Sequence, residues 1–424
     1  MVSSPSNSAP SPAPAFSPYQ IFVIALLSFL QFTIVLDFMI LSPLGAILLR
    51  TLGITTSQFG LVVSSYAVAA GGAGFLTAGF ADRFDRKRLL LFFYMGFVLG
   101  TALCGFSPNY HILLIARIIT GLFGGVVGSI SLAIVADLFP LSARGRVMGF
   151  VQSAFAASQV LGIPIGILLA NHFGWHAPFL MVASVSFLVG IVIVLRLRPI
   201  DGHLAANAKR NPLEHLWQTA TSPRYISGFL ATILLATGGF MLMPFGSAFT
   251  VFNQGIPLQK LPMLYMITGA SSLIIGPFIG RLSDRIGKYS IFCYSTVIGV
   301  AVVIYYTHLS LAPIWLLILV SVILFASISG RIVAASALNS AVPTPEDRGA
   351  YMSISSALQQ LAGGVASMIA GMIVVQSPSG HLEHYPLLGW VVSAGMLIAM
   401  LLMYRVHQLV HQPPPRREMP AVTV

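Results

Sequence analysis

Residues 179–195 read FLMVASVSFLVGIVIVL, and residues 21–36 read IFVIALLSFLQFTIVL. Neither run contains a charged residue, and neither shows the polar–apolar alternation of a strand in a membrane barrel. A helix needs roughly 20 predominantly apolar residues to cross a bilayer, and it satisfies its backbone polar groups internally. These two runs therefore predict helices that span a membrane.

The composition extends this prediction to the whole chain. Of the 424 residues, 56% are hydrophobic and only 8% are charged, whereas a soluble domain carries about 25% charged residues. Such a chain suits a lipid-facing surface, and its apolar runs predict an all-α polytopic membrane protein. The twelve expected spans are 20–43, 57–80, 88–107, 110–138, 145–171, 177–198, 225–250, 260–282, 288–308, 312–340, 348–376 and 386–408. The expected regions are a disordered tail 1–19, a bundle 20–198, a cytoplasmic loop 199–224, a bundle 225–408 and a cytoplasmic tail 409–424.

The distribution of Lys and Arg predicts the orientation. If the N-terminus is cytoplasmic, the outer loops hold Arg50 and Lys260, while Arg117 and Arg331 fall inside spans. The other eighteen of the 22 basic residues then lie on the cytoplasmic side, as the positive-inside rule requires. The net charge of +11 thus reflects membrane topology and not nucleic-acid binding. We expect both termini in the cytoplasm and the protein in the plasma membrane (the bacterial inner membrane).

The two halves of the chain repeat each other. Asp82 and Asp284 lie in similar loops, 202 residues apart, between spans two and three and between spans eight and nine. Arg144 and Arg348, 204 residues apart, precede spans five and eleven. Two loops that repeat at nearly one offset predict a duplication of six spans, the organisation of many transporters.

The loop at residues 78–87, AGFADRFDRK, resembles the G-x-L-A-D-R-x-G-R-K signature of the major facilitator superfamily, with Ala78 and Asp85 as departures from its glycines. The second-half copy matches that signature at Gly280, Leu282, Asp284, Arg285, Gly287 and Lys288. The resemblance covers essentially all twelve spans. It implies two six-helix repeats, alternating access by a rocker-switch motion, and a monomer that transports a small molecule.

The resemblance also implies a cytoplasmic gate. Asp82 would face the start of span eleven, where helix dipoles favour a carboxylate, and the basic cluster would pair with Asp137. Asp284 together with Glu346 or Asp347 would form the mirrored latch. The expected gate residues are Asp82, Arg83, Arg86, Lys87, Asp137, Arg144, Asp284, Arg285, Lys288 and Arg348. The alternative is that these charges only set the topology.

Span four carries Arg117 followed by Gly121, Gly124, Gly125 and Gly128, and this arrangement resembles the span-four motif of the superfamily. Glycines at spacings of three and four let a neighbouring helix approach closely.

Span five carries Gly162, Pro164 and Gly166, which resemble the Gly-Pro-x-x-Gly motif of proton-coupled exporters with Ile163 inserted. With residues 173–175 (FGW), the variant looks like sugar-efflux and arabinose-efflux-permease-like exporters. The motif predicts a bend in this span and favours export over import; an ordinary kink is the alternative.

Of the eleven acidic residues, ten lie in loops, at span ends or in tails, and Asp37 is the one that lies well within a predicted span. Burial favours a neutral carboxyl group and a nearby cation favours the ionised form, so such a group can exchange protons. Asp37 lies six residues before Pro43 and Arg117 seven residues after Tyr110, which puts both about 10 Å from the outer ends of their spans. We therefore expect a proton-coupling pair. A static salt bridge and a site for a substrate amine are the alternatives.

Polar and aromatic residues inside the spans are candidates for the substrate cavity. The predicted lining is Thr33, Gln152, Gln159, Met241, Phe245, Arg331 and Gln359. For Arg331 three interpretations stay open: it binds an anionic group, seals the cytoplasmic gate, or extends to the inner interface.

These features predict a proton-coupled antiporter that exports a drug, sugar or metabolite; a facilitator or symporter of the same fold is the alternative. No span holds paired carboxylates or a nucleophile with a His base, and no Gly-rich Lys loop for ATP is found, so we expect neither an enzyme nor a pump. Cys104 and Cys293 lie in apolar runs and predict neither a disulfide framework nor a metal site. The expected partners are the substrate, protons and lipid, with no cofactor.

Overall fold

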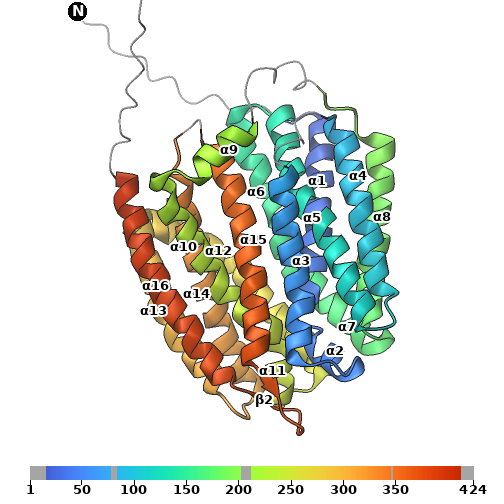
Figure 1. The fold of residues 1–424 in the computed structure, drawn as a ribbon, viewed down its shortest axis with the longest axis vertical. Helices are drawn as coiled ribbons and strands as arrows, with labels where there is room; N and C mark the ends of the chain where they lie inside the picture. Colours follow the sequence, from blue (N-terminus) through green and yellow to red (C-terminus); the bar gives the residue numbers. More distant parts are fainter. Residues whose placement is uncertain (1–15, 78–83, 202–211, 345–346, 412–424) are drawn as a thin grey trace, which may run out of the picture.

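The structure is a computed structural model that describes residues 16–77, 84–201, 212–344 and 347–411. Long helices run side by side between two ends of the molecule (Figure 1). One end carries the short helix α9 (Pro212–Ala220), and we call it the α9 end. The opposite end carries α2 (Gly45–Thr51), α11 (Gly246–Phe252) and a β-hairpin, and we call it the hairpin end.

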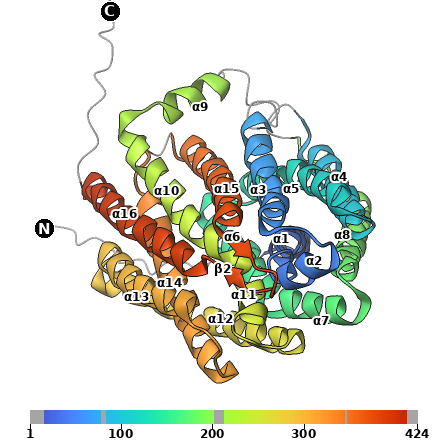
Figure 2. The ribbon, with the colours of Figure 1, turned by 60° about the horizontal axis from the view of Figure 1, so that its bottom comes forward.

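The helices form two groups, which we call the N half (residues 16–201) and the C half (residues 212–411) (Figures 1 and 2). Besides α2, the N half contains α1 (Pro18–Ile40), α3 (Thr56–Thr77), α4 (Arg86–Gly105), α5 (Tyr110–Leu138), α6 (Leu141–Ala157), the π-helix η2 (Ser158–Gly162), α7 (Ile163–Phe173) and α8 (His176–Arg196). Besides α9 and α11, the C half contains α10 (Pro223–Leu242), the 3-10 turns η3 (Met243–Phe245) and η4 (Leu258–Lys260), α12 (Leu261–Ile286), α13 (Lys288–His308), α14 (Ile314–Ser340), α15 (Arg348–Ile373) and α16 (Tyr385–His411).

Eleven helical stretches of the described residues are long and apolar enough to cross a membrane. They include α6, η2 and α7 as one stretch, and α10, η3 and α11 as another. Helix α3 is not among the eleven. With 22 residues, α3 is nevertheless about 33 Å long, which is the thickness of a hydrocarbon core.

Two predictions about regular structure need correction. The predicted loop 199–224 contains α9, and α10 already begins at Pro223. The predicted span 348–376 ends at Ile373, where a hairpin of β1 (Val375–Gln376) and β2 (Leu382–Glu383) follows, so the protein is not purely helical. The side chain of Asn253 explains this hairpin, because its carboxamide accepts from Leu382 N and donates to Leu382 O, both at 2.9 Å.

Polar side chains cap several helices at their first turn. Ser17 and Gln20 form a capping box at the start of α1, each side chain accepting a hydrogen bond from the other residue's backbone N–H. Asn109 caps α5 by accepting from Ile112 N at 3.1 Å. Such caps supply partners to backbone N–H groups that the helix itself leaves unpaired.

The two halves meet along α3 and α15, which lie side by side in both views (Figures 1 and 2). Glycines permit this approach. A Cβ at Gly60 would lie 3.1 Å from Gly371 Cα, and a Cβ at Gly371 would lie 3.2 Å from Gly60 Cα. Small residues at facing positions are typical of helices that pack closely in membranes.

Hydrogen bonds join the two halves at the hairpin end. Ser247 Oγ donates to Ser42 O at 2.8 Å, and Ser42 Oγ donates to Met243 O. Thr56 Oγ1 donates to Val374 O at 2.5 Å. Within the described ranges, no hydrogen bond joins the halves at the α9 end. The structure is therefore closed at the hairpin end.

Candidate functional site

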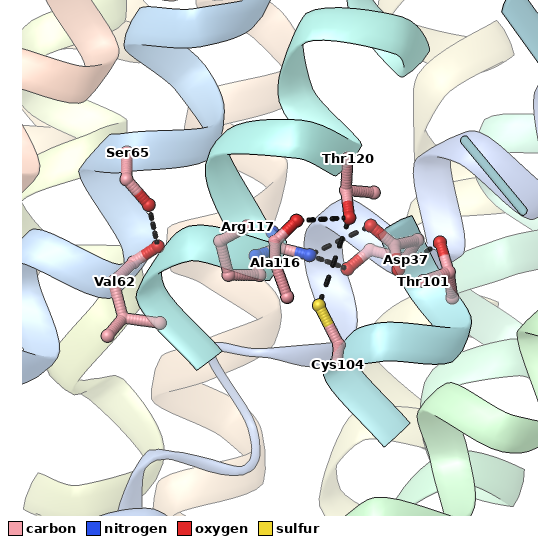
Figure 3. Close-up of polar contacts among 8 residues, drawn as sticks. All are labelled: Asp37, Val62, Ser65, Thr101, Cys104, Ala116, Arg117 and Thr120. Carbon is pink, nitrogen blue, oxygen red and sulfur yellow. Dashed lines mark hydrogen bonds and ion pairs between the residues drawn. The ribbon is translucent and has the colours of Figure 1, made fainter. Parts of the chain in front are cut away.

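Asp37 on α1 and Arg117 on α5 form an ion pair inside the N half (Figure 3). Arg117 Nη1 lies 2.8 Å from Asp37 Oδ2, and both side chains have 0% of their surface exposed. The same Nη1 donates to Asp37 O at 3.3 Å. The contact that was predicted between these two residues is therefore present.

Thr101 on α4 supplies the other hydrogen bond to this carboxylate. Its Oγ1 donates to Asp37 Oδ1 at 3.1 Å, so each carboxylate oxygen has a donor (Figure 3). The sequence did not single out Thr101. It lies four residues before the end of α4, which is about 6 Å along the helix. Its distance from the end of the span is similar to those of Asp37 and Arg117, and this similarity is the signal that could have identified it.

Tyr66 on α3 covers the guanidinium of Arg117, whose Cζ lies 4.5 Å from the centre of the ring. A cation over an aromatic face is stabilised by the ring quadrupole, and more so away from water. Thr120 and Cys104 lie beside the pair, with Thr120 Oγ1 donating to Ala116 O at 2.7 Å and lying 3.8 Å from Cys104 Sγ (Figure 3). The sequence does not single out Tyr66, because one aromatic residue in an apolar span is not distinctive.

The ion pair does not use every donor of Arg117. Its Nε and Nη2 are buried and have no hydrogen-bond partner among the residues that the structure describes. A buried donor without a partner costs roughly 1–3 kcal/mol, and more when it carries charge. The pair is thus held by one nitrogen, so that loss of the Asp37 charge leaves the guanidinium without an anion.

Aromatic rings connect the pair to the C half. The ring of Phe38, the residue after Asp37, lies 5.2 Å from the Tyr66 ring and 5.6 Å from the Phe240 ring of α10. Phe240 in turn lies against Gly363 of α15, where a Cβ would be 2.6 Å from its ring. The contact Phe38–Phe240 therefore crosses between the halves next to the buried carboxylate.

The sequence predicted close approach of a neighbouring helix at four glycines after Arg117, and three of them let α5 approach α3. A Cβ at Gly121 would collide with Tyr66 O, one at Gly124 would lie 2.9 Å from Tyr66 Oη, and one at Gly125 would lie 2.5 Å from Ala70 Cα. Gly128 has nothing within 4 Å of an added Cβ, so the close packing ends before it.

A π-helix lies at the predicted bend of span five. Residues Ser158–Gly162 form η2, and Pro164 follows in the first turn of α7. Proline has no N–H to donate and its ring crowds the carbonyl four residues earlier, so the helix widens locally. A Cβ at Gly162 would lie 2.6 Å from Leu36 Cδ1, and Gly166 similarly lies against Ile40. These glycines set the position of the part of α1 that carries Asp37.

The residues predicted to line a substrate cavity differ in their exposure. Gln152 and Gln359 are exposed, and Gln159 is half-buried in η2 beside Gly269 of α12. Phe245 is fully buried and packs against Phe59 of the N half, with ring centres 5.7 Å apart.

Two further members of that predicted lining face the protein interior. Thr33 is buried, with its Oγ1 3.0 Å from Tyr94 Oη inside the N half. Met241 is also buried, in the apolar core. Arg331 is buried inside the C half and is described below.

Four of the predicted gate residues of the N half have well-defined partners at the α9 end. Arg86 Nε lies 3.0 Å from Asp137 Oδ2, which is the pairing that the family resemblance implied. Arg144 donates to Phe139 O at 3.0 Å and to Ala136 O at 2.5 Å, so it caps the end of α5. Lys87 donates to Val194 O. Asp82 and Arg83 lie outside the described residues.

Asp85 has a role that the sequence did not predict. Its Oδ1 accepts from Arg88 N at 2.8 Å and its Oδ2 accepts from Ile200 N at 2.6 Å. The residue that replaces a glycine of the signature thus caps α4 and attaches the segment after α8 to it.

The mirrored latch has different contacts from those implied. Asp284 is 73% exposed at its side chain and pairs with Lys288, four residues later, at 3.0 Å. Asp347 accepts from Tyr225 Oη at 2.7 Å and lies 3.0 Å from His215 Nε2 of α9. Arg285 and Arg348 are exposed, and Glu346 lies outside the described residues.

Within the described ranges, no group of three His, Cys, Asp or Glu residues could hold a metal ion. Cys104 is buried, Cys293 is half-buried, and neither forms a disulfide.

A family model matches residues 27–344, which is three quarters of the chain. The chain belongs to the Major Facilitator Superfamily. The relatives below are transporters by name.

The "Uncharacterized MFS-type transporter YceJ" of Bacillus subtilis (strain 168) is 28% identical over 61% of this chain and 66% of its own length. A "Probable sugar efflux transporter" of Mannheimia succiniciproducens is 26% identical over 53% of this chain and 56% of its own. The "Multidrug resistance protein MdtG" of Enterobacter lignolyticus is 26% identical over 63% of this chain and 66% of its own. The matches thus cover about half to two thirds of these relatives.

Solved structures share the fold. The inward-facing, unoccupied structure of a bacterial homologue of the human lysosomal transporter Spinster has a TM-score of 0.70 and 16% identity, and covers 93% of this chain and 97% of its own. The nucleoside transporter NupG has a TM-score of 0.74 and 14% identity, and covers 91% of this chain and 99% of its own. At these identities the likeness concerns the superfamily fold.

Proposed function

We propose that this superfamily member is a proton-coupled antiporter that exports a small molecule. The observation that carries the proposal is the fully buried ion pair between Asp37 and Arg117. An ionisable residue within a membrane span is costly and commonly marks a proton or ion pathway. The names of two relatives, a sugar efflux transporter and a multidrug resistance protein, support export of a drug, sugar or metabolite.

Protonation of Asp37 provides the coupling. It removes the charge opposite Arg117 Nη1, and a buried cation without a counter-charge is strongly disfavoured. The protonated form therefore favours a conformation in which the guanidinium reaches water, a carbonyl or the substrate. Because Phe38 follows Asp37 and contacts Phe240 of α10, a shift of α1 changes a contact between the halves.

The proposed topology has twelve spans, with α3 as the twelfth, and the α9 end in the cytoplasm. The lysines and arginines expected at cytoplasmic loops support this orientation, and an even number of spans then leaves both termini on that side. The hydrogen bonds of Ser42 and Thr56 across the hairpin end then make this an inward-facing form. In the outward-facing form these bonds are broken, and the α9 end closes through the gate residues Asp82, Arg83, Arg86 and Asp137 with their C-half counterparts.

The test is solute-driven proton movement. Purified protein is reconstituted into liposomes that contain a pH-sensitive dye, and sugars, lipophilic cations and organic acids are added in turn. We expect at least one solute to move protons through the wild type and not through Asp37→Asn. The matched control is Glu214→Gln, which alters an exposed acid on α9 and leaves proton movement intact. A solute that crosses equally in both proteins without proton flux establishes the facilitator instead, with Asp37 as a structural partner of Arg117.

A further inference from the structure

Arg331 on α14 is a buried cation outside the proposed proton site. Only 4% of its surface is exposed, and its Nε and Nη2 have no hydrogen-bond partner among the described residues. Among the residues that the structure describes, no carboxylate forms an ion pair with Arg331. A buried, unpaired charge in a membrane protein is expensive, and such residues face a pathway or a ligand.

The surroundings of Arg331 leave one edge of the guanidinium, Nε and Nη2, without a hydrogen-bond partner among the described residues. Its Cζ lies 5.6 Å from the centre of the Phe292 ring of α13. A Cβ at Gly238 of α10 would lie 3.9 Å from Nη1, so α10 lies beside the other edge. Ser327, one turn earlier on the same face of α14, donates its hydroxyl to Leu324 O at 2.7 Å and keeps its oxygen as an acceptor.

Arg331 does not extend to the membrane surface. It lies nine residues before Ser340, which is about 14 Å from the α9 end of its helix. The side chain of a helical residue points toward the N-terminus of its helix, which for α14 is the hairpin end. Its neighbour Gly238 is fifteen residues from the start of α10, or about 22 Å from the α9 end. The guanidinium therefore points into the protein and away from that surface.

Arg331 does not seal the cytoplasmic gate in this structure. A seal needs a carboxylate from the N half, and the buried acid of the N half, Asp37, is paired with Arg117. Helix α10 packs mainly against α15 and α16, and Arg331 occupies the position where α14 faces α10. Of the three interpretations left open by the sequence, binding of an anionic group is the one compatible with these contacts.

We propose that Arg331 binds an oxyanion, a carboxylate or a phosphate, of the transported solute. The free donors Nε and Nη2 form one edge of the guanidinium, and two parallel N–H groups on one edge match the two oxygens of a carboxylate or phosphate. The negative charge of the solute would neutralise the Arg331 guanidinium. Among the described residues, no side chain supplies that negative charge. The inference rests on the proposed transport function only in calling the ligand a transported solute.

The test compares small probes that share a ring and differ in charge. Benzoate, phenyl phosphate and the neutral benzamide are added at millimolar concentrations to purified protein, and thermal unfolding is followed by tryptophan fluorescence. We expect benzoate or phenyl phosphate to stabilise the wild type, and benzamide not to. Which of the two acids does so distinguishes a carboxylate from a phosphate. Arg331→Gln abolishes the shift, and Arg331→Lys weakens binding about tenfold, because it keeps the charge and loses the paired donors.

Arg196→Gln is the matched control, since it removes an exposed arginine at the end of α8 and leaves the shift unchanged. Equal stabilisation of Arg331→Gln, or no stabilisation of the wild type by either acid, overturns the inference. Both Arg331 variants must elute as a single species in size-exclusion chromatography. If Arg331→Gln does not fold, the weaker binding of Arg331→Lys is the test. Asp37→Asn should keep the shift in unfolding temperature. If an acid binds but no solute moves protons, only the antiport proposal fails. If solutes move protons but bind equally well to Arg331→Gln, only this inference fails.

Discussion

Gly162 of η2 lies against Leu36 of α1, the residue that precedes Asp37, and a Cβ at Gly162 would be 2.6 Å from Leu36 Cδ1. The bend in span five and the position of the buried carboxylate are therefore linked by direct packing. Because Pro164 prevents a regular helical hydrogen bond at this point, the helix widens and Gly162 accommodates α1.

We expect Gly162→Ala to destabilise the protein by about 1–3 kcal/mol, as overpacking of a close contact does, and to slow proton movement. Thermal unfolding and the dye assay measure the two effects. Gly128→Ala is the control, because an added Cβ there has nothing within 4 Å. Equal behaviour of the two variants would contradict the packing argument.

A double-mutant cycle tests the ion pair. Arg117→Gln leaves Asp37 buried without its partner and should destabilise the protein by about 3–5 kcal/mol. Adding Asp37→Asn removes the stranded charge, so the double variant should be more stable than Arg117→Gln alone. Thermal unfolding in detergent is the measurement. Additive effects of the two substitutions would show that the pair is not coupled in the membrane protein.

Thr101→Val tests the second hydrogen bond to Asp37. The hydroxyl donates to the carboxylate at 3.1 Å, and a hydrogen bond to a charged group contributes about 1.5–3 kcal/mol. Its loss disfavours the ionised carboxylate, so the pH at which proton movement is half-maximal should shift upward by about one unit. Thr101→Ser keeps the donor and should keep the wild-type profile. An unchanged profile in the valine variant would remove Thr101 from the coupling site.

Asp85→Ala tests the cap of α4. Asp85 accepts from Arg88 N and Ile200 N, and loss of an N-cap costs about 0.5–2 kcal/mol. We expect lower thermal stability with proton movement retained at permissive temperature. Asp85→Asn, which keeps one acceptor oxygen, should fall between the alanine variant and the wild type. If alanine is as stable as aspartate, the capping role is wrong.

The helical class, most helix positions and the superfamily follow from patterns along the sequence. A run of apolar residues in lipid must become a helix, since no water is present to pair with its backbone. The pair Asp37–Arg117 was predicted from the similar depth of the two charges together with the helix packing that the superfamily resemblance implies. The hairpin after α15 and helix α9 were missed, because each depends on a distant partner: Asn253 for the hairpin, and Asp347 for α9.

What the sequence by itself determined is the apolar, helical character of the long segments and the position of one acid within the first of them. What only the tertiary structure decided is the surroundings of the charges: Thr101 and Tyr66 at the pair, and the absence of an anion beside Arg331 within the described residues. The physical reason is that apolarity is a property of each segment alone. The environment of a charge is instead built from side chains on different helices, and its free energy depends on distances that a single chain pattern does not contain.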